Sequence, residues 1–326
     1  MRCSSPRCGQ TTRSHSALRA LVSCATLLIP GIAAADLLPW GSGGSGPGQF
    51  ASPTGIVCDH QNRVLVMDTS NGRIQRFTRD GVYLDEWGSV GSEHGQFRGA
   101  EFIAVDAADT VFVADFRNNR VQVFSPEGQF VRTWGSTGSD PGKFQGAFGV
   151  AVGPNGEVYV SDANNHRVQR FTTTGTWLGS FGTTGIGPGE FGLPAGIAVD
   201  WNGDVLVADY TNHRVQRFTA SGAFLSTWGS EGTAEGQLKF PVAIAVTRTA
   251  PIFVVESGNA RVQRFEASGT AAGVIASGLQ GPFGVALDGL GSVFVVETSR
   301  NLISPFADAT TPALKTSWGA LKRRFK

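Results

Sequence analysis

Five acidic residues are each followed, five positions later, by an arginine. The pairs are Asp68/Arg73, Asp115/Arg120, Asp162/Arg167, Asp209/Arg214 and Glu256/Arg261. A functional role would use these side chains directly, whereas a structural role would use charge-assisted hydrogen bonds between them to fix the shape of a loop. Because the same pair recurs in five places, we interpret the pairs as structural.

Two histidines are the next candidates for chemistry. His166 and His213 occupy one recurring position, which Asn119 fills in an earlier repeat. Two histidines that both pointed inward could bind a metal ion. We favour an ordinary polar loop position for both, with the metal role as the alternative.

Aromatic residues recur every 47 residues, at Trp40, Trp87, Trp134, Phe181 and Trp228. One unit, residues 135–181, contains four short apolar runs separated by turn signals such as Asn155-Gly156. Repeats of this length with four strands each are typical of β-propeller blades. We therefore predict an all-β, six-bladed β-propeller of four-stranded antiparallel blades. The six units span residues 41–87, 88–134, 135–181, 182–228, 229–276 and 277–319.

Two segments could supply the terminal strand that closes the ring. Residues 37–40 resemble the end of an outer strand without a blade before it, and residues 313–318 have the same character. Closure removes an exposed sheet edge, and we favour the N-terminal segment. The glycine-rich segments between units, such as residues 44–50, are interpreted as turns.

The third and fourth units carry Asn165-His166-Arg167-Val168 and Asn212-His213-Arg214-Val215. These segments resemble the Asn-His-Leu signature of the NHL-repeat family, and the resemblance covers nearly all of the chain after residue 36. It implies a six-bladed propeller. Some members of the family attach such repeats to zinc modules in ubiquitin ligases, and some bind RNA. This sequence has no Cys/His spacing of that kind, so we disfavour both activities here.

The first 35 residues differ from the repeats. Four arginines precede an apolar run at residues 20–32, and Ala33-Ala34-Ala35 offers a small-residue cleavage site, as in a secretory signal peptide. Its removal takes four of the 27 basic residues and none of the 26 acidic ones. The remaining chain is nearly neutral, which argues against general nucleic-acid binding. We expect an exported protein, periplasmic or secreted, that does not span a membrane.

Three of the four cysteines lie in this first segment, which leaves Cys58 alone at a position where other units carry an apolar residue such as Val105 or Val199. We expect a buried, unreactive thiol and no disulfide. Residues 320–326 form a basic tail, which we expect to be a solvated end.

The residue just before the first strand of each unit should face the mouth of the central channel. In chain order these residues are Thr54, Glu101, Phe148, Ala195, Val242 and Phe283. Peptide-amidating lyases related to this fold carry zinc-binding histidines at about this position, and lactonase-type propellers need several oxygen ligands for calcium. This set has one acid and no histidine. We predict no metal site and no cofactor.

Side chains that differ between units are the remaining candidates for function. On the face that carries the inter-unit segments and the loops between second and third strands, they are Arg98, Glu101, Phe116, Arg117, Phe148 and Tyr210. Aromatic side chains with arginine nearby suit recognition. We predict a non-enzymatic binding scaffold for a protein, peptide or glycan, and a monomer. A metal-dependent lyase or lactonase-like hydrolase with an unrecognised channel site is the alternative.

Overall fold

The computed structural model describes residues 37–246 and 251–308, all within one compact unit of the chain. Three predicted features lie outside these residues: the signal peptide at 1–35, the alternative closing segment at 313–318 and the basic tail at 320–326. Within the described part, no helix has the length and apolar character needed to cross a lipid bilayer.

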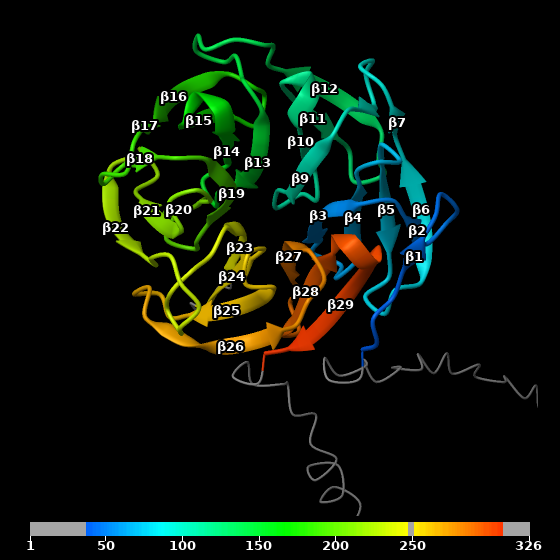
Figure 1. Ribbon diagram of the computed structural model, residues 1–326. Helices are drawn as coiled ribbons and strands as arrows, with labels where there is room; N and C mark the ends of the chain where they lie inside the picture. Colours follow the sequence, from blue (N-terminus) through cyan, green and yellow to red (C-terminus); the bar gives the residue numbers. More distant parts are fainter. Residues whose placement is uncertain (1–36, 247–250, 309–326) are drawn as a thin grey trace, which may run out of the picture. The chain divides into compact units, whose positions relative to one another are not determined.

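Six antiparallel sheets are arranged in a ring, with the first strand of each innermost (Figure 1). The first three blades are β3 (Pro53–Cys58), β4 (Val64–Asp68), β5 (Arg73–Phe77) and β6 (Tyr83–Trp87); β9 (Ala100–Val105), β10 (Val111–Asp115), β11 (Arg120–Phe124) and β12 (Phe130–Trp134); and β13 (Ala147–Val152), β14 (Glu157–Asp162), β15 (Arg167–Thr172) and β16 (Trp177–Phe181).

The other three are β19 (Pro194–Val199), β20 (Val205–Asp209), β21 (Arg214–Phe218) and β22 (Phe224–Trp228); β23 (Pro241–Val246), β24 (Ile252–Glu256), β25 (Arg261–Phe265) and β26 (Ala271–Ser277); and β27 (Pro282–Leu287), β28 (Ser292–Glu297) and β29 (Leu302–Ala307). Consecutive first strands contact one another around the ring, and β27 returns to β3. These contacts confirm the predicted six-bladed β-propeller.

Position within the blade explains the composition of each strand. The second strand lies between two others and between two neighbouring blades, so β10 is buried along its whole length and is almost entirely apolar. The fourth strand lies at the outer edge, and along β6 partly buried and exposed residues alternate. This alternation is that of a strand with one solvated face.

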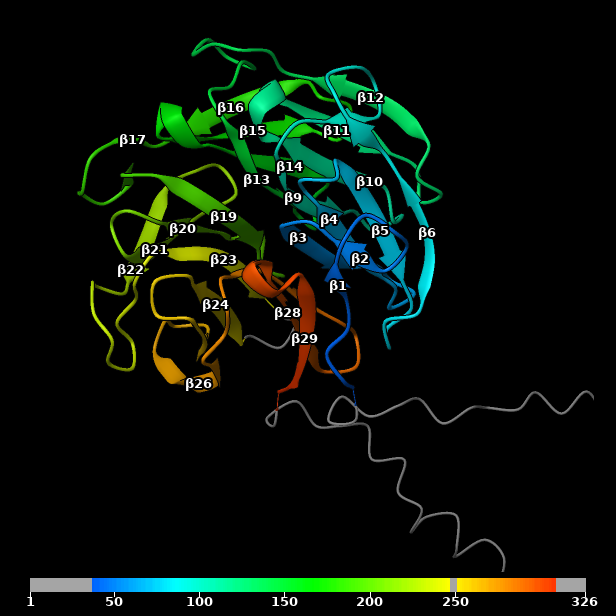
Figure 2. The same cartoon turned by 45° about the vertical axis from the view of Figure 1, so that its right-hand side comes forward.

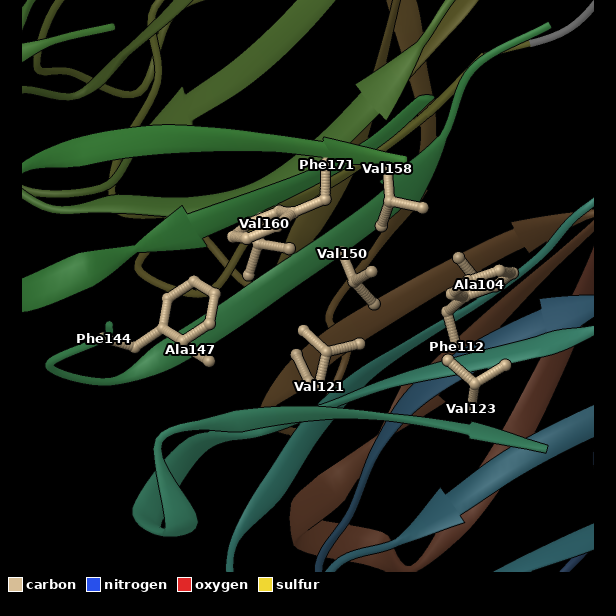
Figure 3. Close-up of a cluster of buried hydrophobic side chains, with 11 residues drawn as sticks. Ala104, Phe112, Val121, Val123, Phe144, Ala147, Val150, Val158, Val160 and Phe171 are labelled. Carbon is tan, nitrogen blue, oxygen red and sulfur yellow. The ribbon is translucent and has the colours of Figure 1, made fainter. Parts of the chain in front are cut away.

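The hydrophobic core lies between blades rather than within any one of them. Figure 3 shows one such cluster, in which Phe112 and Val121 of blade 2 face Val150, Val160 and Phe171 of blade 3. Each blade therefore buries both faces of its sheet by packing against its neighbours. A single blade could not bury these faces alone, so the ring is the unit of stability.

The recurring aromatic residues pack each blade against the next. Trp87, the last residue of blade 1, packs on Gly128 of blade 2. Gly128 lies in the turn between the third and fourth strands of that blade. A Cβ on Gly128 would lie 2.7 Å from the indole ring, and the residue has φ +83°. Equivalent contacts join Trp134 to Gly175 and Trp228 to Gly269. The 47-residue period thus records a packing contact between blades.

The N-terminal segment closes the ring, as predicted, but by a bridge rather than by a full strand. Trp40 and Ile303 on β29 exchange two backbone hydrogen bonds, of 3.0 and 2.8 Å. Figures 1 and 2 show this segment beside β29. Leu37 joins the cluster between blades 1 and 6. The last sheet therefore has three strands plus this bridge, where the prediction had four full strands.

The segments between blades are more ordered than the turns that the sequence predicted. Short parallel ladders form between β1 (Ser42–Gly43) and β2 (Gln49–Phe50), β7 (Ser89–Val90) and β8 (Gln96–Phe97), and β17 (Thr183–Thr184) and β18 (Glu190–Phe191). Phe50, Phe97 and Phe191 at their ends are fully buried. These buried phenylalanine rings pack each segment against the core. We call the face that carries these ladders and the loops between second and third strands the loop face.

The aromatic–glycine contacts give a test of inter-blade packing. Gly128→Ala adds a methyl group against Trp87, whereas Gly156→Ala, at φ +76°, meets nothing within 4 Å. Both variants incur roughly 1–2 kcal/mol from the left-handed backbone. Gly128→Ala should lose a further 1–3 kcal/mol, roughly, from overpacking. Equal losses in chemical denaturation would show that the contact does not hold the blades together.

Candidate functional site

A buried carboxylate at the end of each second strand organises the loop face. In blade 3, Asp162 is fully buried. Its Oδ2 accepts hydrogen bonds from Arg167 at 2.8 Å, Asn165 at 2.8 Å and Gln169 at 3.1 Å. Its Oδ1 accepts the backbone N–H of Gln145 at 2.8 Å, in the segment that leads into the blade. One carboxylate thereby joins the loop, the third strand and the inter-blade segment.

The arrangement recurs around the ring. Ion pairs of 2.6–3.0 Å join Asp68 to Arg73, Asp115 to Arg120, Asp209 to Arg214 and Glu256 to Arg261. In blade 6 the pattern changes, since Glu297 is hydrogen-bonded by Ser304 and lies 3.6 Å from Arg300. The oxygens of these carboxylates are engaged in contacts that build the loop face.

His166 and His213 connect neighbouring blades. Each has a positive φ, of 53° and 56°, at the end of the loop between second and third strands. Nδ1 of His166 lies 2.7 Å from the carbonyl oxygen of Gly192, and Nδ1 of His213 accepts the N–H of Phe240 at 3.1 Å. Asn119 fills the same position and accepts the N–H of Gly146 at 2.7 Å. In all three blades the side chain bonds to the backbone of the segment that leads into the next blade, which explains why a polar residue recurs there.

The residues predicted at the channel mouth are the second residues of the first strands, not the residues before them. Thr54, Ala195 and Val242 are buried. The hydroxyl of Thr54 donates to the carbonyl of Glu101 at 3.0 Å, so it joins blades 1 and 2. Phe148 and Phe283 are partly exposed, and their ring centroids lie 6.1 Å apart across the channel.

Phe102 is the central residue of the mouth, and the sequence analysis missed it. The equivalent position holds Gly55, Gly149, Gly196, Ala243 and Gly284 in the other blades. A Cβ on Gly55 would lie 2.5 Å from the next blade's backbone, which explains the small residues. The ring of Phe102 instead lies 5.5 Å from Phe148 and 5.7 Å from Phe283. We call Phe102, Phe148 and Phe283 the three-ring floor. Alignment of the units at this position could have revealed the exception.

Glu101 directly precedes Phe102 on β9 and has an unusual environment. Its Oε2 is buried and has no hydrogen-bond partner. Burial raises the pKa of Glu101 to about 7, although the positive charge of Arg117 acts in the opposite direction. A carboxyl group with these properties in a cleft is a candidate functional group.

One side of the mouth is formed by Phe116, Phe148, Glu101 and Arg117. Phe116 packs edge-on against Phe148 at 5.6 Å. Arg117 is exposed and follows Phe116 in the short 3₁₀ helix η2 (Phe116–Asn118). Tyr210, in blade 4, stacks on Phe240 at 5.0 Å and packs against the cluster that Phe102 and Phe283 also contact. Arg98 is exposed at the end of the inter-blade segment.

Below the mouth, apolar side chains line the channel. Its cavity of about 200 Å³ is lined by first-strand residues such as Ile103, Val150 and Ile244. Cys58, which the sequence predicted to be buried, is half-buried and also lines it, and desolvation raises the pKa of its thiol. In the described part of the chain, no group of three or more His, Cys, Asp or Glu side chains is arranged to hold a metal ion.

Comparison with known sequences identifies the repeats. Residues 97–124, 144–171 and 191–218 match the family model of the NHL repeat. A 50-residue stretch is 42% identical to Protein lin-41 of Caenorhabditis elegans. That stretch is 15% of this chain and 4% of the curated relative, so the chain spans a small part of that protein's length.

Solved structures share the fold at low sequence identity. Virginiamycin B lyase from Staphylococcus aureus is similar with a TM-score of 0.57 and 18% identity, over 78% of this chain and 84% of that one. A gluconolactonase from Xanthomonas campestris is similar with a TM-score of 0.62 and 14% identity, over 80% of this chain and 87% of that one. At these identities the likeness establishes the fold alone.

The environment of Glu101 predicts a pH-dependent cost to stability. Ionising this carboxyl inside the protein is unfavourable, so its raised pKa lowers stability as pH increases from about 4.5 to about 7. A shift of this size corresponds to roughly 3 kcal/mol. Glu101→Gln should therefore be more stable than the wild type at about pH 8, and close to it at about pH 4.

Thermal unfolding of both proteins across this range measures the difference. Glu93→Gln, which changes an exposed carboxylate on the same face, is the matched control and should follow the wild type. An advantage of Glu101→Gln that did not change with pH would contradict the assignment.

Proposed function

We propose that this six-bladed propeller with NHL repeats is a non-enzymatic binding scaffold that recognises a partner at the mouth of its loop face. The observation that carries the proposal is the three-ring floor, which places aromatic side chains at the channel mouth of a scaffold that is otherwise repetitive. Phe116 and Tyr210 extend this apolar area, with the exposed guanidiniums of Arg98 and Arg117 beside it.

Aromatic and arginine side chains are the residue types that dominate binding energy at interfaces. Rings packed against one another lose little conformational freedom when a ligand binds, which reduces the entropic cost of association. The ligand classes that suit this area are a protein segment, a peptide or a glycan. The signal-like sequence of residues 1–35 supports a role outside the cytoplasm.

A lyase or hydrolase is the second candidate. It is favoured by one observation, the buried carboxyl of Glu101 with its pKa raised to about 7, which is near the value suited to general acid–base catalysis. Solved propellers of this shape include a lyase and a gluconolactonase. Stoichiometric zinc or calcium in protein purified without a metal-binding tag, together with turnover of a lactone, would favour this candidate.

The scaffold proposal predicts that binding depends on the rings of the loop face. Phe116→Ala combined with Tyr210→Ala should weaken a ligand selected from peptide and glycan arrays about tenfold or more, because truncated aromatic contacts at hot spots cost 2 kcal/mol or more. Surface plasmon resonance gives the affinities.

Trp201→Ala supplies the control, since Trp201 is 65% exposed in a turn between first and second strands. This variant should bind as the wild type does. Unchanged affinity in the double variant, with loss in the Trp201 variant, would place recognition on the other face and contradict the proposal.

A further inference from the structure

The channel mouth combines an aromatic surface with a carboxylate oxygen that has no partner. Among the described residues, Glu101 is the carboxylate with a buried oxygen that accepts no hydrogen bond. A buried charge without a partner is unfavourable, and it is retained where a ligand or another group supplies the missing contact. The raised pKa agrees with this description.

The three-ring floor is built at the same level of the first strands as Glu101. Phe102 follows Glu101 in the chain, and Phe148 and Phe283 occupy the same strand position as Glu101 in their own blades. The centroids of the three rings lie 5.5–6.1 Å apart, so the rings touch and form a continuous apolar surface. All three are partly exposed.

An aromatic face attracts a cation within about 6 Å of its centroid, and the attraction grows where water is excluded. A ligand that pairs apolar carbon with one positive charge would satisfy both features of the mouth. We infer that the mouth binds an alkylammonium group, with Glu101 as its counter-ion and the three-ring floor as its apolar support. This inference rests on the proposed function and names the chemistry of the ligand.

Arg117 is the charged neighbour that opposes such a ligand. It lowers the pKa of Glu101 and would repel a cation. Its side chain packs over Gly99, about 3.2 Å from where a Cβ would stand, and it is exposed to solvent. Water and salt screen an exposed charge more than a buried one. The buried carboxylate therefore determines the sign of the ligand.

Three probes of equal length separate the possibilities: n-butylammonium, 1-butanol and butyrate. NMR titration of the protein at about pH 8 should show the ammonium binding about tenfold more tightly than the alcohol. At about pH 5.5 its affinity should fall by on the order of tenfold, because Glu101 is then protonated. Butyrate binding more tightly than the ammonium would overturn the inference, as would equal binding of ammonium and alcohol.

Variants assign the effect to residues. Glu101→Gln should lose the preference for the cation and its pH dependence, while it keeps the weak binding of the alcohol. Phe102→Gly, which installs the residue of four other blades, should weaken both probes. If that variant is unfolded by circular dichroism, Phe102→Ala, the residue type of blade 5, takes its place. Glu93→Gln should change nothing. Ammonium binding by Glu101→Gln at wild-type affinity would refute the inference.

A titration with a peptide identifies the source of the ammonium group. A blocked Gly-Lys-Gly peptide that binds at least as tightly as n-butylammonium would indicate a lysine of a partner, and its ε-acetylated form should not bind. Binding of the free amine alone would indicate a small organic cation. If no cation binds while array ligands still depend on Phe116 and Tyr210, the inference fails and the scaffold proposal stands. If the ammonium binds but the affinity of the array ligands is unchanged by substitution of Phe116 and Tyr210, the scaffold proposal fails instead.

Discussion

A buried carboxylate at the end of each second strand is the interaction on which the rest of this propeller depends. It is desolvated, so it must receive several hydrogen bonds, and its donors come from three different parts of the chain. In blade 3 these are Arg167 on the third strand, Asn165 in the loop and the backbone of Gln145 in the inter-blade segment. Where those parts are fixed, the side chains that follow the carboxylate have defined positions. Phe116 and Tyr210 are such side chains, each next in sequence to one of these aspartates.

The repetition of the sequence made the fold predictable. Trp87 and its counterparts recur because each touches a glycine of the next blade, so a packing contact is visible as a period. The pairing of Asp162 with Arg167 was likewise expected from spacing. The parallel ladders were not expected, because their glycine-rich sequence is typical of turns. The buried residues at their ends, such as Phe97, are isolated apolar residues with no strand pattern around them.

The candidate site was harder to predict, because its residues are exceptions to the repeat. Phe148 and Glu101 stood out by type, but Phe102 did not, since an apolar residue in an inner strand is ordinary. Its importance depends on the glycine that the other blades carry at this position and on the space across the channel. The lack of a hydrogen-bond partner for Oε2 of Glu101 depends on the three-dimensional structure and is not visible in the spacing of residues. Functional asymmetry in a repeat protein therefore has to be sought where one unit departs from the others.

The bridge between Trp40 and Ile303 has a consequence for how the chain folds. Contacts between neighbouring blades join residues that are close in sequence, so blades can add to one another as each is completed. The closing seam instead joins residues such as Ser52 and Asn301, which are 249 positions apart, so it has the largest loop-closure entropy of the ring. We therefore expect the seam between blades 1 and 6 to be the last part to form. By the same argument we expect the ring to open first at this seam.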